Sequence, residues 1–277
     1  MTYQDLFETI RKKRSYLCVG LDTDPAKLPK HLLDHPNPVL EFNRRIIEAT
    51  APYCVAYKPN TAFYEAMGSQ GWELLRQTLE LIPRTHFSIA DAKRGDIGNT
   101  SKMYAKAFFE DMKADAITVA PYMGADSVQP FLEFEGKWTI LLALTSNSGS
   151  QDFQVLNVDE DHCLFERVIK TSQVWGDKHQ MMYVVGATQT TELQAVRKLA
   201  PDHFLLVPGV GAQGGSLEEV SKWGMNRHCG LLVNASRSIL WASDGEDFAE
   251  AAAAEARRLQ EHMSHYLEKY LPSQQHD

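Results

Sequence analysis

The chain has 277 residues, of which 44% are hydrophobic and 23% are charged, and its formal net charge is −8. These values are typical of a globular protein with one large core or two smaller ones. The acidic balance argues against a general nucleic-acid or anionic-membrane surface, but it leaves room for a local basic pocket that binds a small anion.

The chain opens with "MTYQDLFETIRKKRS", which lacks the apolar centre of a signal peptide. The spacing of Thr2 and Asp5 predicts a capping box at the start of an amphipathic helix. No later run approaches the roughly 18 to 20 apolar residues that a membrane helix needs. We therefore expect a protein without a membrane span.

The four cysteines, Cys18, Cys54, Cys163 and Cys229, are scattered along the chain. They form no C-x-x-C motif and no close group with histidines, so neither a zinc site nor a disulfide framework is indicated. The sequence therefore predicts no metal site and a reducing, cytoplasmic location.

Short apolar runs rich in β-forming residues recur along the whole chain. We count eight, at residues 16–22, 54–60, 86–93, 116–121, 139–146, 181–188, 204–211 and 230–237. Nearly continuous hydrophobicity is typical of parallel strands that are buried on both faces. Amphipathic segments such as 126–136 and 216–224 lie between the runs, and 246–271 has the apolar spacing of a closing helix.

Eight strands that alternate with helices predict an α/β protein, a (β/α)₈ TIM barrel that forms one domain over residues 1–277. The alternative is a doubly wound open sheet. It is disfavoured because its first strand is usually followed by G-x-G-x-x-G, whereas "GLDTDP" stands here. The longest gap between strands, 147–180, is predicted to hold an elaborated loop and a helix on the catalytic face.

Polar residues follow these strands repeatedly, at the end of the barrel where such folds carry their chemistry. The third strand ends in "DAKRGD", and strand periodicity places Asp91 and Lys93 on one face, while Gly95 lets Asp96 leave the strand. Two carboxylates would hold the lysine as a cationic proton donor. A structural ion pair is the alternative, but Lys58, at the end of the second strand, adds a second ammonium group and favours an active site.

A second candidate site lies after the seventh and eighth strands. "VPGVGAQGG", residues 207–215, places small residues where backbone amides can approach a ligand, and Arg237 follows the next strand. Because these two loops are the recurrent phosphate site of this fold, we expect a phosphate here.

The sequence also carries a family resemblance. "DAKRGDIGNT" resembles the D-x-K-x-x-D-I-x-x-T signature of orotidine 5′-monophosphate decarboxylases, in the form found in the larger bacterial branch. "VGLDTDP", "YKPNTAFYE", "TSNSG", "PGVGAQGG" and "NASRSI" are similar to the other active-site segments of that family and occur in the same order. The resemblance covers nearly the whole chain. It implies decarboxylation of orotidine 5′-monophosphate to uridine 5′-monophosphate (UMP), the last step of de novo UMP synthesis.

The resemblance also implies a role for each matching residue. Lys93 would deliver a proton to the ring carbon that loses CO₂, with Asp91 beside the substrate carboxylate, and no cofactor or metal would be needed. Asp96, Ile97 and Thr100 would reach across a homodimer interface, so that Asp96 completes an alternating array with Lys58, Asp91 and Lys93. The remaining substrate-binding positions are Asp22 and Lys58 for the ribose, Ser146 for the pyrimidine, and Pro208, Gln213 and Arg237 for the lid and the phosphate. Ser236, directly before Arg237, is a further substrate-binding candidate. Ser236 stands where the compact branch usually has glycine.

Three other functions compete with this interpretation. A sugar-phosphate lyase or synthase on the same barrel would depend on magnesium, and a catalytically silent nucleotide-binding barrel would have lost one of the four charges. A fusion with orotate phosphoribosyltransferase needs a longer chain. The complete charge set in "DAKRGDIGNT" and its ordered companion segments favour the decarboxylase.

Overall fold

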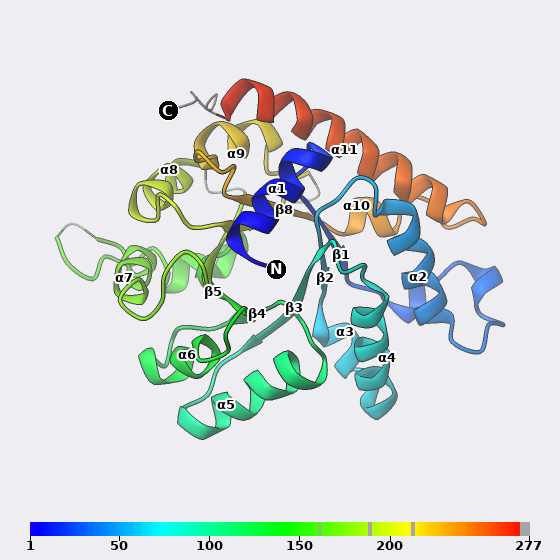
Figure 1. Ribbon diagram of the computed structural model, residues 1–277, viewed down its shortest axis with the longest axis horizontal. Helices are drawn as coiled ribbons and strands as arrows, with labels where there is room; N and C mark the ends of the chain where they lie inside the picture. Colours follow the sequence, from blue (N-terminus) through cyan, green and yellow to red (C-terminus); the bar gives the residue numbers. More distant parts are fainter. Residues whose placement is uncertain (161, 188–189, 212–213, 272–277) are drawn as a thin grey trace.

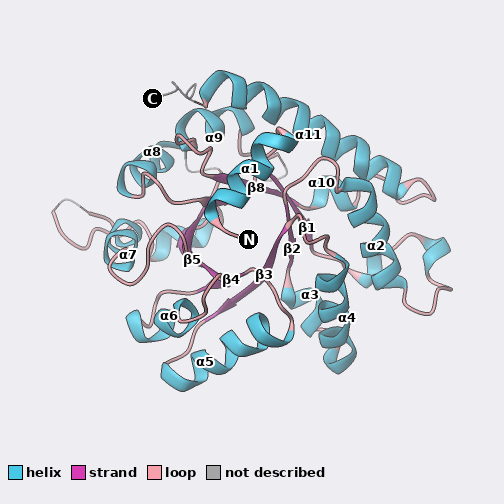
Figure 2. Ribbon diagram, in the orientation of Figure 1, coloured by secondary structure: helices cyan, strands magenta, loops and turns pink. Residues whose placement is uncertain are grey.

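The computed structural model describes the chain except for residues 161, 188–189, 212–213 and 272–277. Its parallel strands form a closed barrel in sequence order, from β1 to β8 (Figures 1 and 2). The strands are β1 (Leu17–Leu21), β2 (Ala56–Pro59), β3 (Phe87–Arg94), β4 (Ala116–Val119), β5 (Trp138–Leu144), β6 (Met181–Val185), β7 (Leu205–Pro208) and β8 (Leu231–Ala235). The predicted (β/α)₈ barrel is confirmed, and the open sheet is excluded because β8 pairs with β1.

Helices surround the barrel and cover one of its ends (Figure 2). They are α1 (Tyr3–Lys13), α2 (Pro38–Thr50), α3 (Thr61–Glu65), α4 (Gly68–Leu81), α5 (Gly98–Lys106), α6 (Ala125–Leu132), α7 (Leu164–Ser172), α8 (Thr190–Leu199), α9 (Leu217–Gly224), α10 (Arg237–Leu240) and α11 (Phe248–Tyr270). Shorter helical segments are η1 (Pro25–Lys27), η2 (Lys30–Leu32), η3 (Ala107–Asp111) and η4 (Ser148–Asp152). In the described part of the chain, no helix combines the length and apolar character needed to cross a membrane.

Helix α1 closes the amino-terminal end of the barrel (Figure 1). It begins with the predicted capping box, in which Asp5 N donates to Thr2 Oγ1 and Thr2 N donates to Asp5 Oδ2. The ring of Tyr3 packs edge-on against Phe204, with 5.0 Å between the centroids, directly before β7. Because α1 covers this end, the opposite end, where the strands finish, is the one that a ligand can enter.

The two long segments outside the strands also match the prediction. The excursion at 147–180 contains η4 and α7, and the predicted closing helix is α11. Phe248 at the start of α11 stacks on Phe42 of α2 at a centroid distance of 4.9 Å, and both rings are fully buried. Truncating such a buried ring to alanine typically costs about 3 to 5 kcal/mol, so α11 is an integral part of the fold.

Candidate active site

The centre of the candidate site is the carboxylate of Asp91, which lies between two ammonium groups. Lys58 Nζ donates to Asp91 Oδ2 at 2.5 Å, and Lys93 Nζ donates to Asp91 Oδ1 at 2.6 Å. The side chains of Lys58 and Asp91 are only 6% and 10% exposed, whereas that of Lys93 is 50% exposed. Lys93 is therefore the member of this array that is most open to a ligand in the barrel mouth.

Asp91 and Lys58 keep each other ionised although both side chains are buried. Burial alone would raise the pKa of Asp91, but Lys58 and then Lys93 outweigh it and hold that pKa well below its usual range. Burial likewise opposes the charge of Lys58, and the nearby carboxylates of Asp91 and Asp22 overcome it, so that the pKa of Lys58 is raised. At neutral pH these two side chains therefore form a fixed ion pair.

The backbone of Lys93 departs from the strand geometry that the sequence predicts. Its φ of 48° is in the left-handed region, which costs a non-glycine residue about 1 to 3 kcal/mol. Beside it the ladder is irregular, because Ala90 pairs with Ile117 but Arg94 pairs with Val119. The predicted contact between Asp91 and Lys93 is thus present, but it depends on a bulge and not on regular alternation.

Thr118 of β4 fills the gap that this bulge leaves. Lys93 N donates to Thr118 Oγ1 at 2.9 Å, and Thr118 Oγ1 donates to Asp91 Oδ1 at 3.0 Å. The threonine is 1% exposed. One buried hydroxyl therefore connects the backbone of Lys93 with the carboxylate of Asp91.

A second polar group lies where β1 and β8 end. Ser236 Oγ donates to Asp22 Oδ2 at 2.8 Å. Asp22 Oδ1 and Asn234 Oδ1 are buried and have no hydrogen-bond partner among the described residues. Buried acceptors are normally satisfied, so these two oxygens are suited to receive hydroxyl groups of a ligand.

Gly20 makes room for this group. A β-carbon at Gly20 would lie 2.8 Å from Ser236 Cβ and 3.1 Å from Asn234 Oδ1, so any larger residue would displace them. The strand register places Gly20 opposite Lys58, which joins this group to the ion pair of Asp91. The side chain of Ser236, directly before Arg237, is therefore accommodated by a glycine on the neighbouring strand.

The loop after β7 has the open backbone that the sequence predicts. Gly209, Gly211 and Gly214 have φ values of 97°, 72° and 87°, which favour glycine. Pro208 ends β7, and Arg237 begins α10 with an exposed side chain just after β8. Gln213 lies outside the described residues. The described part of the predicted phosphate site is thus at the same end of the barrel as Asp91.

Ser146 follows β5 and is partly buried. A β-carbon at Gly186 would come within 2.7 Å of the Ser146 backbone, so this glycine allows Ser146 to lie against the end of β6. Thr145 N donates to Gln154 Oε1 at 2.7 Å, and this bond joins the end of β5 to the segment that follows η4.

Asp96, Ile97 and Thr100 lie apart from the array within one chain. Asp96 Oδ1 accepts a bond from Ile97 N at 2.7 Å, while Ile97 is 55% exposed and Thr100 is exposed at the start of α5. Among the described residues, Lys93 forms an ion pair with Asp91 and not with Asp96. The expected pair of carboxylates around Lys93 is therefore not formed inside a single chain.

Sequence reasoning missed Thr118 and Asn234, which lie inside the apolar runs "AITVAP" and "GLLVNASR". Both are polar residues in otherwise hydrophobic strands, and both are buried. That interruption of a doubly buried strand is the signal that could have identified them.

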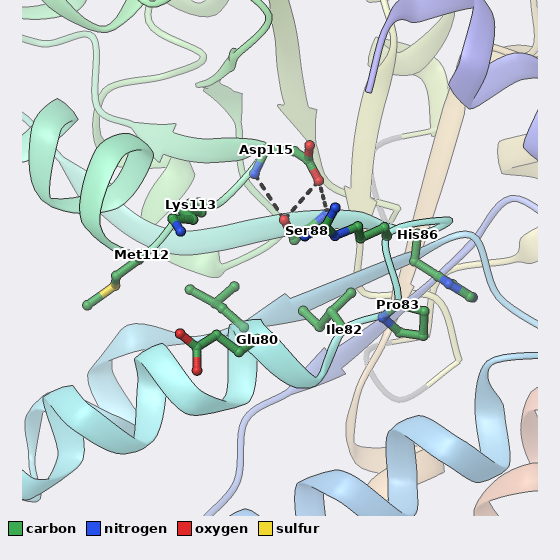
Figure 3. Close-up of a pocket in the computed structure, with 10 residues that line it drawn as sticks. Glu80, Ile82, Pro83, His86, Ser88, Met112, Lys113 and Asp115 are labelled. Carbon is green, nitrogen blue, oxygen red and sulfur yellow. Dashed lines mark hydrogen bonds between the residues drawn. The ribbon is translucent and has the colours of Figure 1, made fainter.

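A cavity of about 430 Å³ lies at the other end of the barrel and is lined by residues that include His86, Ser88, Lys113 and Asp115 (Figure 3). Asp115 Oδ2 accepts bonds from Ser88 N and Ser88 Oγ, so its carboxylate fixes the starts of β3 and β4. Residues at this end of a (β/α)₈ barrel generally serve stability, and the cavity is separate from the charged array.

A (β/α)₈ barrel with buried fixed charges and a glycine-rich loop at its carboxyl-terminal end has the architecture of barrel enzymes that bind phosphorylated ligands. The model of the orotidine 5′-phosphate decarboxylase / HUMPS family matches residues 15–252. The chain belongs to this family.

Individual relatives agree with the family. An orotidine 5′-phosphate decarboxylase of Bacteroides fragilis is 58% identical over 98% of this chain and 100% of its own. The structure of Leishmania donovani OMP decarboxylase is 38% identical and superposes with a TM-score of 0.79 over 94% of this chain and 99% of its own. The structure of Leishmania donovani UMP synthase is 40% identical and superposes with a TM-score of 0.81. The match covers 94% of this chain but only 57% of that protein.

These similarities establish the activity. The chain is a carboxy-lyase that converts orotidine 5′-monophosphate to UMP in pyrimidine biosynthesis. The magnesium-dependent sugar-phosphate lyase or synthase considered as an alternative is not favoured by relatives that carry the decarboxylase name.

Proposed function

We propose that Lys93 protonates the ring carbon from which CO₂ departs, and that Asp91 and Lys58 hold Lys93 in place. The observation that carries this proposal is the array in which Asp91 receives hydrogen bonds from both lysines. Lys93 is the most exposed member of the array, so its ammonium group is the one best placed to meet the reacting carbon.

The chemistry explains why fixed charges are needed. Loss of CO₂ from this ring carbon leaves a carbanion-like transition state with no carbonyl placed to absorb the electrons. An ammonium group held in advance where negative charge develops stabilises that state without reorganisation during the reaction. We propose that this electrostatic effect operates without a metal or organic electron sink. Repulsion between Asp91 and the substrate carboxylate would add to it.

The other polar groups are proposed to bind the rest of the nucleotide. Asp22, Lys58 and Asn234 would contact the ribose, since Asp22 and Asn234 offer buried oxygens without a described partner. Ser146 would contact the pyrimidine. Pro208, Gln213, Ser236 and Arg237 would form the lid and the phosphate site, so that remote binding energy closes the site over the reacting carbon.

We further propose a homodimer in which Asp96, Ile97 and Thr100 complete the partner's site. Four apolar residues around α5 and the turn before α6 are strongly exposed: Ile97, Met103, Tyr122 and Met123. Helices α5 and α6 lie side by side (Figure 1), joined by the bond from Ser101 Oγ to Ser127 O at 2.9 Å. Such an exposed apolar region is typical of an interaction surface.

The proposed location is the cytoplasm. All four cysteines are free thiols, and three of them are buried, which is the pattern expected in a reducing compartment. We also propose that residues 1–277 act as one domain, because the barrel and its covering helices use nearly the whole chain.

The first experiment follows the ultraviolet loss of orotidine 5′-monophosphate with excess chelator. We expect rapid conversion by the wild-type chain and none by Lys93→Ala, while Lys198→Ala, an exposed lysine on α8, serves as the matched control. Loss of activity in chelator would contradict the metal-free proposal, and sugar phosphates with magnesium would then be tested. A fully active Lys93→Ala variant would reject the proposed proton donor.

The shared site is tested by mixing Lys93→Ala with Asp96→Ala and allowing subunits to exchange. If Asp96 acts across the interface, each mixed dimer has one intact site, and about a quarter of the wild-type rate returns at equal ratio. If Asp96 acts within its own chain, no site is intact and mixing restores nothing.

A further inference from the structure

We propose that Thr118 is a positioning residue whose hydroxyl raises the rate of decarboxylation through Asp91 and Lys93. This inference rests on the roles proposed above for those two residues. Thr118 itself is 1% exposed and its hydroxyl is bonded to protein groups, so it acts behind the charged array and not on the substrate.

The hydroxyl of Thr118 accepts one hydrogen bond and donates another. The oxygen accepts from Lys93 N at 2.9 Å, and the hydroxyl proton goes to Asp91 Oδ1 at 3.0 Å. Asp91 Oδ1 is also the atom that receives Lys93 Nζ at 2.6 Å. The backbone amide of Lys93 therefore bonds to Thr118 Oγ1, its ammonium group bonds to Asp91 Oδ1, and these two oxygens bond to each other.

The bulge explains why a side chain is needed at this point. Regular pairing between β3 and β4 is interrupted between Ala90 and Arg94, and the Lys93 amide finds a side-chain acceptor in Thr118 instead of a strand carbonyl. Lys93 must keep a φ of 48°, which an L-residue holds only when its surroundings enforce it. Without the hydroxyl, that amide is left unsatisfied and one carboxylate oxygen loses a donor.

The expected consequence is a loss of rate more than a loss of affinity. Displacing a catalytic group by about 1 Å can lower a rate by about 100-fold, because the transition state depends on its position. The proposed ribose and phosphate contacts come from β1, β2, β7 and β8, and only Thr118 of β4 is changed. Ground-state binding should therefore change little.

The test compares Thr118→Val, Thr118→Ala and Thr118→Ser with the wild-type chain. We expect Val and Ala to lower kcat for orotidine 5′-monophosphate by about 100-fold with less than about a threefold change in KM and in the affinity for UMP. Serine keeps the hydroxyl and should recover most of the loss. Thr139→Val is the matched control, because Thr139 is a buried strand threonine whose Oγ1 has no hydrogen-bond partner in the described part of the chain.

Each outcome is decisive. A kcat within about threefold of wild type in a folded Val variant overturns the inference, as does a serine variant no better than alanine. If Val does not fold, the Ser and Ala variants, which differ only by the hydroxyl, make the same comparison. Lys93→Ala is measured alongside: if it stays active, the proposed site has failed, whereas an inactive Lys93→Ala beside a normal Thr118→Val rejects only the role of Thr118.

Discussion

Replacing Asp91 by asparagine should destabilise the fold as well as stop the reaction. The substitution leaves the ammonium group of Lys58, whose side chain is 6% exposed, without the carboxylate 2.5 Å away. Breaking a buried pair by removing one partner typically costs about 3 to 5 kcal/mol. Asp22 still attracts Lys58, so we expect a loss near the lower end, about 3 kcal/mol of unfolding free energy.

Two matched variants separate this explanation from a general effect of mutating the site. Lys93→Met also removes one bond to Asp91, but the Lys93 side chain is 50% exposed and the pair of Lys58 and Asp91 survives. This variant should lose less than about 1 kcal/mol of unfolding free energy. Adding Lys58→Met to Asp91→Asn removes the unpaired charge. The unfolding free energy of the double variant should therefore return to within about 1 kcal/mol of the wild-type value.

The assay is urea unfolding followed by tryptophan fluorescence, with all variants at one protein concentration. Burial is the largest single influence on Lys58 and opposes its charge, so without Asp91 we expect its pKa in the fold to fall below that in the unfolded chain. The unfolded chain then binds more protons, so the variant's stability should rise relative to wild type as the pH increases from 7 toward 10. A folded Asp91→Asn within about 1 kcal/mol of wild type at pH 7 would refute the reasoning.

Four further changes test other parts of the structure. Arg197→Met should lower the free energy of unfolding in urea by about 4 kcal/mol, because the guanidinium of this partly buried side chain donates to several backbone carbonyls, which include Gly224 O at 2.7 Å, and the variant leaves them unsatisfied. A loss below about 1 kcal/mol would argue against that. Burial, and after it the charge of Arg197, lower the pKa of His203 from 6.5 to about 4. The stability that the neutral histidine contributes is therefore fully present above pH 6.5, and about 2 kcal/mol of unfolding free energy is lost as the pH falls from 7 to 5. His203→Leu should flatten this pH dependence, and an unchanged slope would exclude the histidine as its source. Gly20→Ala should lower kcat/KM by crowding Ser236, and Ser236→Gly should restore it if the clash is the cause. Arg237→Ala should lower kcat/KM by orders of magnitude although it is remote from the reacting bond, and a near-normal value would show that the phosphate grip does not drive closure.

The sequence allows the fold to be predicted because the relevant signals are local. Runs of apolar residues with β propensity identify all eight strands, and the spacing of Thr2 and Asp5 identifies the first helix cap. The same signals cannot reveal the bulge at Lys93, since its φ of 48° depends on how β3 pairs with β4. Thr118 and Asn234 were missed for a related reason, because their importance arises only when neighbouring strands bring Asp91 or Gly20 beside them.

The charge balance of the site gives a physical reason for the proposed dimer. In one chain, Lys58 and Lys93 share the single carboxylate of Asp91, with Asp22 acting on Lys58 from the side. Lys93 is left half exposed, with one described carboxylate partner. A second carboxylate on that open side would fix the ammonium group before the substrate arrives, which is how preorganised charges lower a barrier. Among the described residues, Asp96 does not pair with Lys93 of its own chain, and its Oδ1 accepts a bond from Ile97 N at the start of α5 instead. An Asp96 from a partner would supply it, so assembly of the dimer and assembly of the charge array would be the same event.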